Sequence, residues 1–399
     1  MEDIIKEEVK PDEAKEIFDS VKLEIKEEVK EKLKKNKVTS TIKEKREYTL
    51  DDAIELYKEF SSFLETNTDI IPDTGVKQTI STGIDLLDAI LGGGFVIGAL
   101  NIIVGQPGSG KSMLAIQTLG QAQRQFKGNL IGAFLDSEES TTTIRLANLG
   151  VKYPKIKPYN DVSIEKVFKF LEGLCIFKQE KGLVDTPSVV VWDSIANTLS
   201  NKEREAEDIN SVIGYRAKLL SLLVPKYVSK CAKNNICFIA VNQLRDSLQM
   251  GPYQAPRDLK FMSASKEMPG GTILKYNAFQ LIEMKTGRVL EVDKYGFDGI
   301  SVKLKCVKNK LFPPNIEIEI VGSFTTGFSN FWTNYEFLKT SKKLNSGAWN
   351  YLIEMPETKF RTRDAYDLYK SNDEFRKVFD KVAQQTIKEE IIDKNYFEV

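Results

Sequence analysis

Histidine is absent from this chain of 399 residues, and cysteine is scarce. Without histidine, Ser-His-Asp and Cys-His catalysis and the commonest zinc sites are excluded, so acid–base chemistry must use carboxylates, lysines or tyrosines. The cysteines show no CxxC spacing, which predicts reduced, packed thiols in a cytoplasmic setting. There are four of them: Cys175, Cys231, Cys237 and Cys306.

An excess of one charge and a long apolar run are also missing. The 57 basic residues balance 57 acidic ones, so bulk electrostatics give no support to nucleic-acid binding. No apolar run approaches the roughly 20 residues of a transmembrane helix, and the N-terminus lacks the layout of a signal peptide. We therefore expect a soluble protein of two or three domains with no membrane association.

The most informative feature that is present is a phosphate-binding pattern, G-x-x-x-x-G-K-[ST]. Backbone N–H groups of such a loop cradle nucleotide phosphates, its lysine reaches the β- and γ-phosphates, and its Ser hydroxyl binds Mg²⁺. The apolar run 100–104 before it is typical of a buried strand, and 113–119 after it suits a helix, so the context predicts a P-loop for ATP and Mg²⁺. The pattern consists of Gly105, Gln106, Pro107, Gly108, Ser109, Gly110, Lys111 and Ser112.

Composition divides the chain into four parts. Residues 1–46 are rich in Glu and Lys, which leaves a solvated helix, a disordered arm or a partner-binding coiled coil open. Residues 47–75 have helical periodicity, and this helix could pack on its own core or dock on a neighbouring subunit. Alternating strand and helix patterns over 76–322 predict an α/β core around a central, mostly parallel sheet, and 323–399 is predicted to be a small C-terminal domain.

Polar residues end three of the apolar strand runs. Asp193 follows 189–192 in the manner of a Walker B strand, whose acid holds Mg²⁺. Glu138 follows the run 130–135, where a carboxylate can orient water and accept its proton, although a helix N-cap cluster is the alternative. Gln243 ends 236–241, where an amide can contact the γ-phosphate, and it precedes a long segment of little periodicity.

Together these motifs resemble, in order, the RecA family of strand-exchange recombinases over about residues 76–355. The Arg216-Ala217-Lys218 segment and Pro225 look more like the phage UvsX branch than bacterial RecA. The resemblance implies a RecA-like P-loop ATPase core. The motifs are Ile80-Ser81-Thr82-Gly83, the P-loop, Asp136-Ser137-Glu138, Asp193-Ser194, Asn242-Gln243, Gly270-Gly271 with Leu274-Lys275-Tyr276, Val307-Lys308-Asn309-Lys310, and Ser346-Gly347-Ala348-Trp349.

The resemblance also implies roles for single residues. Glu138 matches the glutamate that activates water, and Gln243 matches the glutamine that couples γ-phosphate sensing to the loop behind it. Lys111, Ser112 and Asp193 match the ligands of phosphate and Mg²⁺. Two lysines, Lys308 and Lys310, match those that reach a neighbouring subunit's ATP, whereas without the resemblance they would be read as a solvated turn.

The resemblance places two DNA-facing loops near 198–213 and 244–271, neither of them strongly basic. The family grips stretched DNA through backbone amides after the Gly-Gly pair and a few cations. The candidates by position are Gly270, Gly271, Lys218 and Arg245. A secondary DNA site falls at Lys303 and Lys305.

One departure from the family pattern concerns the base of the nucleotide. Arg145 stands where the family usually has a tyrosine that stacks on adenine. A guanidinium plane can also stack on a base, so ATP binding is expected to survive while base selectivity is open.

The resulting expectation is an ATP-dependent DNA recombinase that forms helical filaments on single-stranded DNA. It would pair that strand with homologous double-stranded DNA and hydrolyse ATP in response to DNA. Single-strand-binding and loader proteins are expected partners, in a host cytoplasm if the chain is phage-encoded. The alternatives are a hexameric RecA-fold helicase or motor, and an ATP-binding recombination mediator without strand exchange.

Overall fold

The computed structural model describes residues 77–152, 158–208, 212, 214–246 and 266–395, together with three helical residues, Glu55, Lys58 and Glu59. The chain separates into two units, residues 1–76 and 77–399. The predicted charged arm 1–46 and nearly all of the predicted helix 47–75 lie outside the described residues. The architecture below is that of the second unit.

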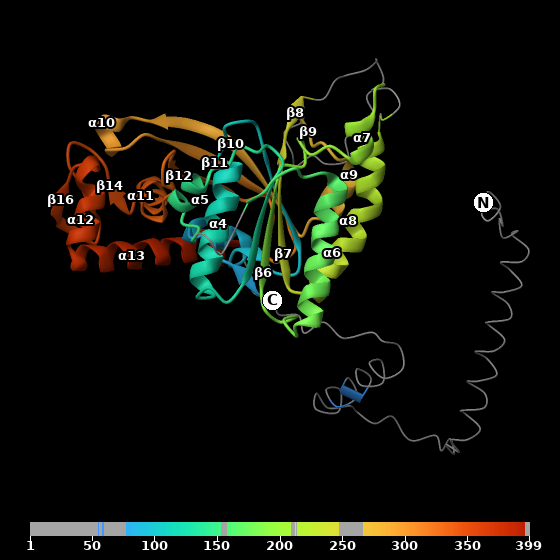
Figure 1. Cartoon of the computed structure of the whole chain (residues 1–399). Helices are drawn as coiled ribbons and strands as arrows, with labels where there is room; N and C mark the ends of the chain where they lie inside the picture. The colour runs from blue at the N-terminus through green and yellow to red at the C-terminus, as the bar shows by residue number, and fades with distance from the viewer. Residues whose placement is uncertain are drawn as a thin grey trace, which may run out of the picture. The chain divides into compact units, whose positions relative to one another are not determined.

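A nine-stranded sheet forms the centre of this unit (Figure 1). Its strand order is β13-β12-β11-β10-β3-β7-β6-β4-β5, parallel from β10 to β5 and antiparallel from β10 to β13. This agrees with the predicted RecA-like α/β core. The strands are β3 (Leu100–Gly105), β4 (Ile131–Asp136), β5 (Pro158–Tyr159), β6 (Ser188–Asp193), β7 (Ile236–Gln243), β10 (Gln280–Leu290), β11 (Gly299–Asn309), β12 (Glu317–Ser323) and β13 (Gly327–Phe328).

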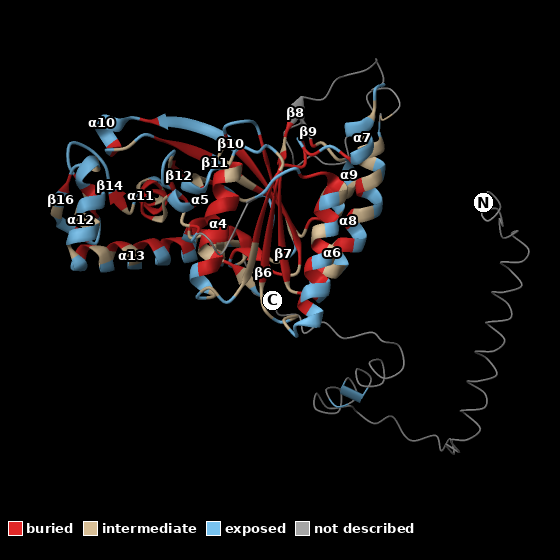
Figure 2. Ribbon diagram, viewed as in Figure 1, coloured by how far each residue is buried: buried red, intermediate tan, exposed pale blue. Residues whose placement is uncertain are grey.

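Helices cover both faces of the sheet and bury two separate hydrophobic clusters (Figure 2). Strands β3 and β6 are buried along their whole length, as expected of strands that are covered on both sides. The cluster on one face includes side chains of α6 (Ile164–Glu180), α8 (Tyr215–Lys233) and α9 (Thr272–Asn277). The cluster on the other includes α3 (Asp85–Leu91), α4 (Lys111–Gln125) and α5 (Thr143–Asn148).

Strand register brings the predicted polar residues to one edge of the sheet. Asp136 is paired with Asp193 at the ends of β4 and β6, and Gly105 with Gln243 at the ends of β3 and β7. Because parallel strands have their carboxyl ends at the same edge, this is where ligands bind in open α/β sheets. The sheet therefore positions the P-loop beside the other candidate residues.

The C-terminal segment packs on the sheet through a third hydrophobic cluster. Leu290 and Tyr295, from the far end of the β10–β11 hairpin, belong to that cluster together with Val321 of β12. Its helices and strands are α11 (Asn330–Thr340), β14 (Leu344–Asn345), β15 (Asn350–Leu352), β16 (Met355–Phe360), η2 (Thr362–Asp364), α12 (Ala365–Ser371), α13 (Asp373–Ile387) and η3 (Lys388–Asp393).

The four cysteine thiols are buried and free of disulfides, as predicted. Among the described helices, none has the length and apolar character needed to cross a membrane. Short elements complete the described fold. They are β1 (Thr79–Ile80), β2 (Phe95–Val96), α7 (Asn201–Glu205), β8 (Arg245–Asp246), β9 (Lys266–Glu267) and α10 (Val292–Tyr295).

Candidate active site

The predicted P-loop, residues 105–112, connects buried strand β3 to helix α4. Gly110 is the N-cap of α4 with φ of 83°, a left-handed conformation that favours glycine. A Cβ there would also lie 2.7 Å from Phe328 Cζ of β13. Both facts require glycine at this position. The loop therefore presents backbone N–H groups at a helix N-terminus, where phosphates bind.

Lys111 is nearly buried, and its ammonium lies over the loop itself. Its Nζ donates a hydrogen bond of 2.7 Å to the backbone oxygen of Gln106. Burial lowers the pKa of Lys111, while the charges of Asp193 and Glu138 oppose that shift. A buried cation that has only a neutral acceptor for a hydrogen-bond partner is suited to an incoming phosphate.

Asp193 lies at the end of β6 and is only 5% exposed. Burial raises the pKa of its carboxyl to about 6, although a hydrogen bond with the Ser112 side chain acts in the other direction. Its Oδ1 is buried without a hydrogen-bond partner. An unpartnered buried carboxylate oxygen beside a Ser hydroxyl is the donor set expected for a divalent cation, so these residues fit Mg²⁺.

Glu138 projects from the turn after β4 toward the end of β6. Asp136 holds this turn by accepting hydrogen bonds from Glu138 N (3.1 Å) and Thr141 N (2.9 Å). The Glu138 carboxylate accepts a hydrogen bond of 3.0 Å from Ser194 Oγ and another from Asn197 Nδ2. The N-cap of the following helix α5 is Thr142, not Glu138. Glu138 thus lies exposed beside Asp193 and Lys111, the position that a water-orienting group requires.

Gln243 ends β7 directly beside the P-loop. It is paired with Gly105, and the next residue, Leu244, donates its N–H to the Gly105 oxygen at 3.1 Å. The preceding Asn242 donates from Nδ2 to the oxygen of Pro269 at 2.8 Å and accepts from Gln243 N. The sequence prediction missed this role of Asn242, which joins the phosphate edge to the far end of the predicted DNA-facing loop.

The predicted DNA-facing segment leaves and re-enters the fold at one place. Strands β8 and β9 pair with each other, and residues 247–265 between them lie outside the described residues, as does the side chain of Arg245. Gly270 and Gly271 follow with φ of 95° and 80°. A Cβ on Gly271 would lie 3.7 Å from Ala217 Cβ, so the glycine pair lies beside the first turn of α8 and its exposed Lys218.

Lys308 and Lys310 do not approach the P-loop of their own subunit. Lys308 is paired with Leu281, and Leu281 with Ile102, which places the lysine about 10 Å short of Gly105 along the strands. Its Nζ donates to the oxygens of Lys275 and Tyr276, both at 2.8 Å. Lys310 Nζ lies 5.8 Å from the centre of the Phe279 ring. Neither ammonium can reach phosphates held by the same chain.

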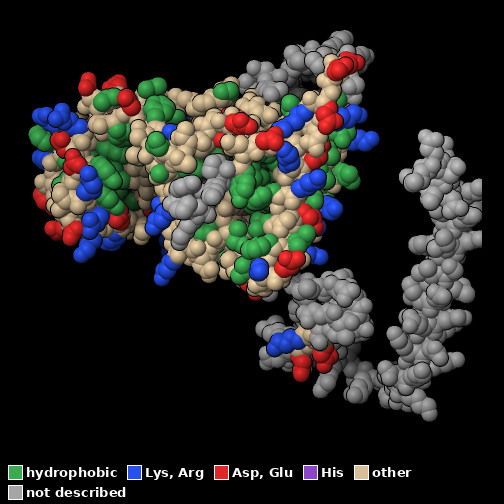
Figure 3. Space-filling model, in the orientation of Figure 1, with side chains coloured by type: hydrophobic (Ala, Val, Ile, Leu, Met, Phe, Trp, Pro, Cys, Tyr) green, Lys and Arg blue, Asp and Glu red, His purple; other side chains and the backbone are tan. Residues whose placement is uncertain are grey.

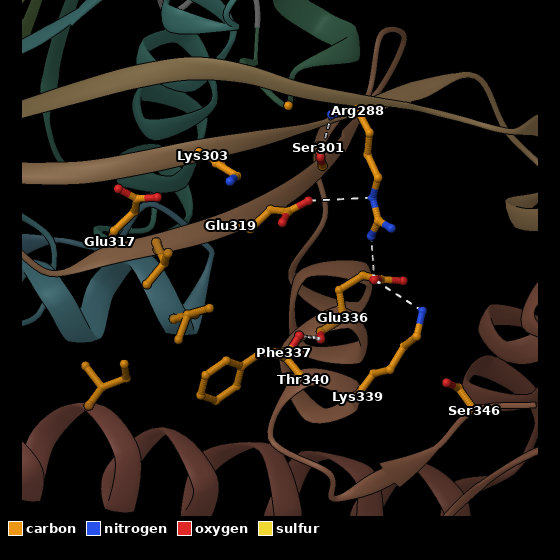
Figure 4. Close-up of a pocket in the computed structure, with 14 residues that line it drawn as sticks. Arg288, Ser301, Lys303, Glu317, Glu319, Glu336, Phe337, Lys339, Thr340 and Ser346 are labelled. Atoms are coloured by element: carbon orange, nitrogen blue, oxygen red, sulfur yellow. Dashed lines mark hydrogen bonds and ion pairs between the residues drawn. The ribbon is translucent and has the colours of Figure 1, made fainter. Parts of the chain in front are cut away.

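The predicted secondary DNA lysines lie opposite acidic side chains. Lys303 is paired with Glu319 and Lys305 with Glu317 across β11 and β12. Lys303 also lines a cavity of about 810 Å³ between this hairpin and α11 (Figure 4). The charged groups in that cavity comprise three cations and three carboxylates, so the local positive charge is balanced. Basic and acidic side chains are likewise interspersed over the described surface that Figure 3 shows.

Arg145 lies in α5 and connects it to the turn between β12 and β13. Its Nη1 donates to the backbone oxygen of Phe324 at 2.7 Å. Phe324 is 48% exposed, and Phe328, four residues further along the chain, lies next to Gly110 of the P-loop. The hydrogen bond thus fixes the Arg145 guanidinium against the turn that carries Phe324. Phe324 was not found from the sequence, because no local pattern marks it.

Comparisons with known proteins identify the family. A model of the RecA N-terminal domain matches residues 67–329. Protein RecA of Thermus aquaticus is 31% identical over 289 residues, covering 72% of this chain and 78% of that protein. Protein RecA of Crocosphaera subtropica is 30% identical over 273 residues, with coverages of 68% and 72%. Because the family model covers well over half of the chain and the nucleotide edge has the geometry described above, this chain belongs to the RecA family.

Proposed function

We propose that this protein is an ATP-dependent DNA recombinase that works as a helical filament on single-stranded DNA. The observation that carries the proposal is the separation of Lys308 and Lys310 from the P-loop of the same subunit. A nucleotide site that uses these lysines needs a second copy of the chain, whose β11 end would contribute them. RecA-family membership supports the same assembly, with single-stranded DNA and homologous double-stranded DNA as partners.

The residues at the nucleotide edge divide the work of hydrolysis. Lys111 and the backbone N–H groups of the P-loop would bind the phosphates of ATP. Ser112 and Asp193 would hold Mg²⁺, which neutralises phosphate charge when it is bound. Glu138, fixed by Ser194 and Asn197, would orient water and accept its proton.

Arg145 and Phe324 would hold the base of the nucleotide. The hydrogen bond from Arg145 Nη1 to the Phe324 backbone fixes the guanidinium, whose plane can stack on a base. The exposed Phe324 ring offers a second apolar surface.

The DNA would bind at the opposite end of α9 from Lys308. Gly270 and Gly271 would offer backbone N–H groups to DNA phosphates, with Lys218 and Arg245 as the nearby cations. Lys303 and Lys305 would form a weaker secondary site, because Glu319 and Glu317 reduce their positive field. Gln243 would report the γ-phosphate to this region through Asn242.

A finer placement within the family rests on helix α8. Its Arg216-Ala217-Lys218 start and internal Pro225 favour the phage UvsX branch, which would place the protein in a host cytoplasm. Single-strand-binding and loader proteins would then be its partners.

The proposal is tested by measuring ATP hydrolysis with and without single-stranded DNA, paired with negative-stain imaging. We expect stimulation by DNA and helical filaments in the presence of ATP. Rings of six under all nucleotide conditions would favour a helicase or motor instead. Hydrolysis indifferent to DNA, with no filaments, would overturn the proposal.

The Lys111→Ala variant serves as the negative control in the same assay. It is expected to lose ATP binding and filament formation, since the buried ammonium that would make charge-assisted hydrogen bonds to the phosphates is removed. Normal hydrolysis by this variant would refute the site assignment.

A further inference from the structure

Helix α9 links the predicted DNA-facing loop to the lysine that is expected to act on a neighbour. It begins immediately after Gly271, at the carboxyl edge of the sheet, and ends at Asn277, three residues before β10 begins at Gln280. Phe279 N already bonds to the oxygen of Leu100, at the start of β3. The helix therefore runs from the nucleotide edge back toward the opposite end of the sheet.

This helix has little intrinsic stability. It contains six residues, and its N-cap, Gly271, offers no side chain to satisfy the first N–H groups. Isolated helices much shorter than about 12 residues do not persist in water. Leu274 is its single fully buried side chain, with Ile273 packed against the same hydrophobic cluster, so contacts at the ends of α9 add to a small packing surface.

Lys308 supplies the contact at the carboxyl end of α9. The last carbonyls of a helix lack intrahelical partners, and a cation there is favoured by the helix dipole. Lys308 Nζ donates to two of these carbonyls, those of Lys275 and Tyr276, both at 2.8 Å. Before the other end of α9, Asn242 holds the chain by donating to the oxygen of Pro269, which precedes the glycine pair.

Phosphate competes with these carbonyls for the same ammonium group. The carbonyls of α9 occupy two of the three N–H donors of Lys308. Hydrogen bonds from an ammonium to an anionic oxygen are roughly twice as strong as those between neutral groups. A phosphate presented by a second subunit can therefore draw the ammonium off the helix.

We propose that Lys308 is a positioning residue with two alternative partners: the C-terminus of α9 in the free subunit and a neighbour's nucleotide in the assembly. The contact with a neighbour's nucleotide rests on the proposed function, whereas the contact with α9 does not. Capture of the nucleotide releases the end of α9, so the glycine pair at the other end of this short helix becomes free to adjust to DNA. Assembly and DNA binding are thereby coupled through one side chain.

The test is hydrogen–deuterium exchange of the full-length protein, followed in peptides that cover residues 272–279. In the nucleotide-free protein, kept dissociated by salt and checked by light scattering, Lys308→Met is expected to speed exchange of α9 on the order of tenfold. Lys308→Arg should restore protection, because its guanidinium can still donate to two carbonyls. Lys310→Met is the matched control and should leave α9 exchange as in the wild type, since Lys310 lies on Phe279 instead.

Two outcomes would overturn the inference separately from the proposed function. If α9 exchanges equally fast in the wild type and in Lys308→Met, Lys308 does not hold the helix. If assembly of the wild type on an ATP analogue without DNA leaves α9 as protected as before, the two-position mechanism is wrong. DNA-stimulated ATP hydrolysis can persist in either case, so a failure here leaves the recombinase proposal standing.

Discussion

Asp193 at the nucleotide edge and Glu336 in the C-terminal helices are both buried carboxylates, 5% and 8% exposed, but their surroundings differ. Burial raises the pKa of Asp193 to about 6, and its Oδ1 has no hydrogen-bond partner. Burial also acts to raise the pKa of Glu336, yet the Tyr295 hydrogen bond and the charges of Lys339 and Arg288 outweigh it and lower that pKa. Figure 4 shows the ion pairs of Glu336 with Arg288 and Lys339.

The difference separates a site prepared for a ligand from a structural network. At the nucleotide edge the fold leaves Asp193 Oδ1 and the buried Ser109 hydroxyl without hydrogen-bond partners, a free-energy cost that a bound cation or phosphate would offset. In the C-terminal helices, Glu336 accepts from Arg288 Nη2 at 2.6 Å and from the Tyr295 hydroxyl at 2.8 Å. The nucleotide edge is therefore less stable than it would be with these groups paired, which suits a ligand-binding site. In the C-terminal helices, the buried charge of Glu336 instead holds the β10–β11 hairpin to α11.

The largest expected effect is on hydrolysis, through Glu138→Gln. A general base contributes about 10²–10⁴-fold, so ATP turnover should fall by that factor while nucleotide binding and stability stay within about 0.5 kcal/mol. Glu139→Gln is the matched control, because the Glu139 carboxylate accepts a hydrogen bond from Asp161 N instead of from Ser194 and Asn197. Equal losses in both variants, measured by steady-state ATPase assay, would mean that Glu138 has no special role.

Asp193→Asn is expected to stabilise the nucleotide-free protein by on the order of 2 kcal/mol at pH 8, while abolishing Mg²⁺-dependent hydrolysis. The pKa of Asp193 is raised from 3.8 to about 6 in the folded state, so ionisation of this carboxyl destabilises the folded protein. This destabilisation grows as pH rises from about 4 and reaches its full size above about pH 6. The stability gained by the variant should therefore shrink as pH falls through 6, in urea unfolding at several pH values.

Asp136, a nearby carboxylate, serves as the control, because its replacement is expected to change the free energy of unfolding in the opposite direction. Asp136 accepts two backbone N–H groups with its two oxygens, so Asp136→Asn should destabilise by about 1–2 kcal/mol. If both asparagine variants destabilise equally, Asp193 is not the unsatisfied group described above.

A feature can be predicted from the sequence when the residues that form it are close together along the chain. The P-loop was predicted because its strand, glycine turn and helix lie within about 20 consecutive residues. The Arg145 contact with Phe324 joins residues 179 positions apart and depends on sheet order, which no local pattern contains. The carbonyl partners of Lys308 are backbone atoms, which leave no trace in residue identity.

Glu336→Gln is expected to destabilise the protein by about 1–2 kcal/mol, since the amide keeps the shape but loses the charge between Arg288 and Lys339. The folded-state pKa of Glu336 is lowered, so this stability is present above its unfolded value near 4.5 and is lost as pH falls below it. Glu319→Gln, at a more exposed partner of Arg288, should change stability by less than about 0.5 kcal/mol. Equal values in urea unfolding at pH 7 would show that the buried network adds nothing.

The smallest expected effect lies where the two regions meet, at Arg145→Tyr. Arg145 bonds to the backbone of Phe324, at the start of the C-terminal segment, so the variant tests whether this contact serves the base or the fold. Arginine can donate to the O6 and N7 acceptors of guanine, whereas tyrosine offers mainly a stacking surface. We expect kcat/KM for ATP relative to GTP to rise several-fold, which corresponds to about 1 kcal/mol, with little change in the unfolding midpoint. A loss of stability with an unchanged ratio would assign Arg145 to the structural network, and Arg145→Lys, which keeps charge without the planar face, separates stacking from charge.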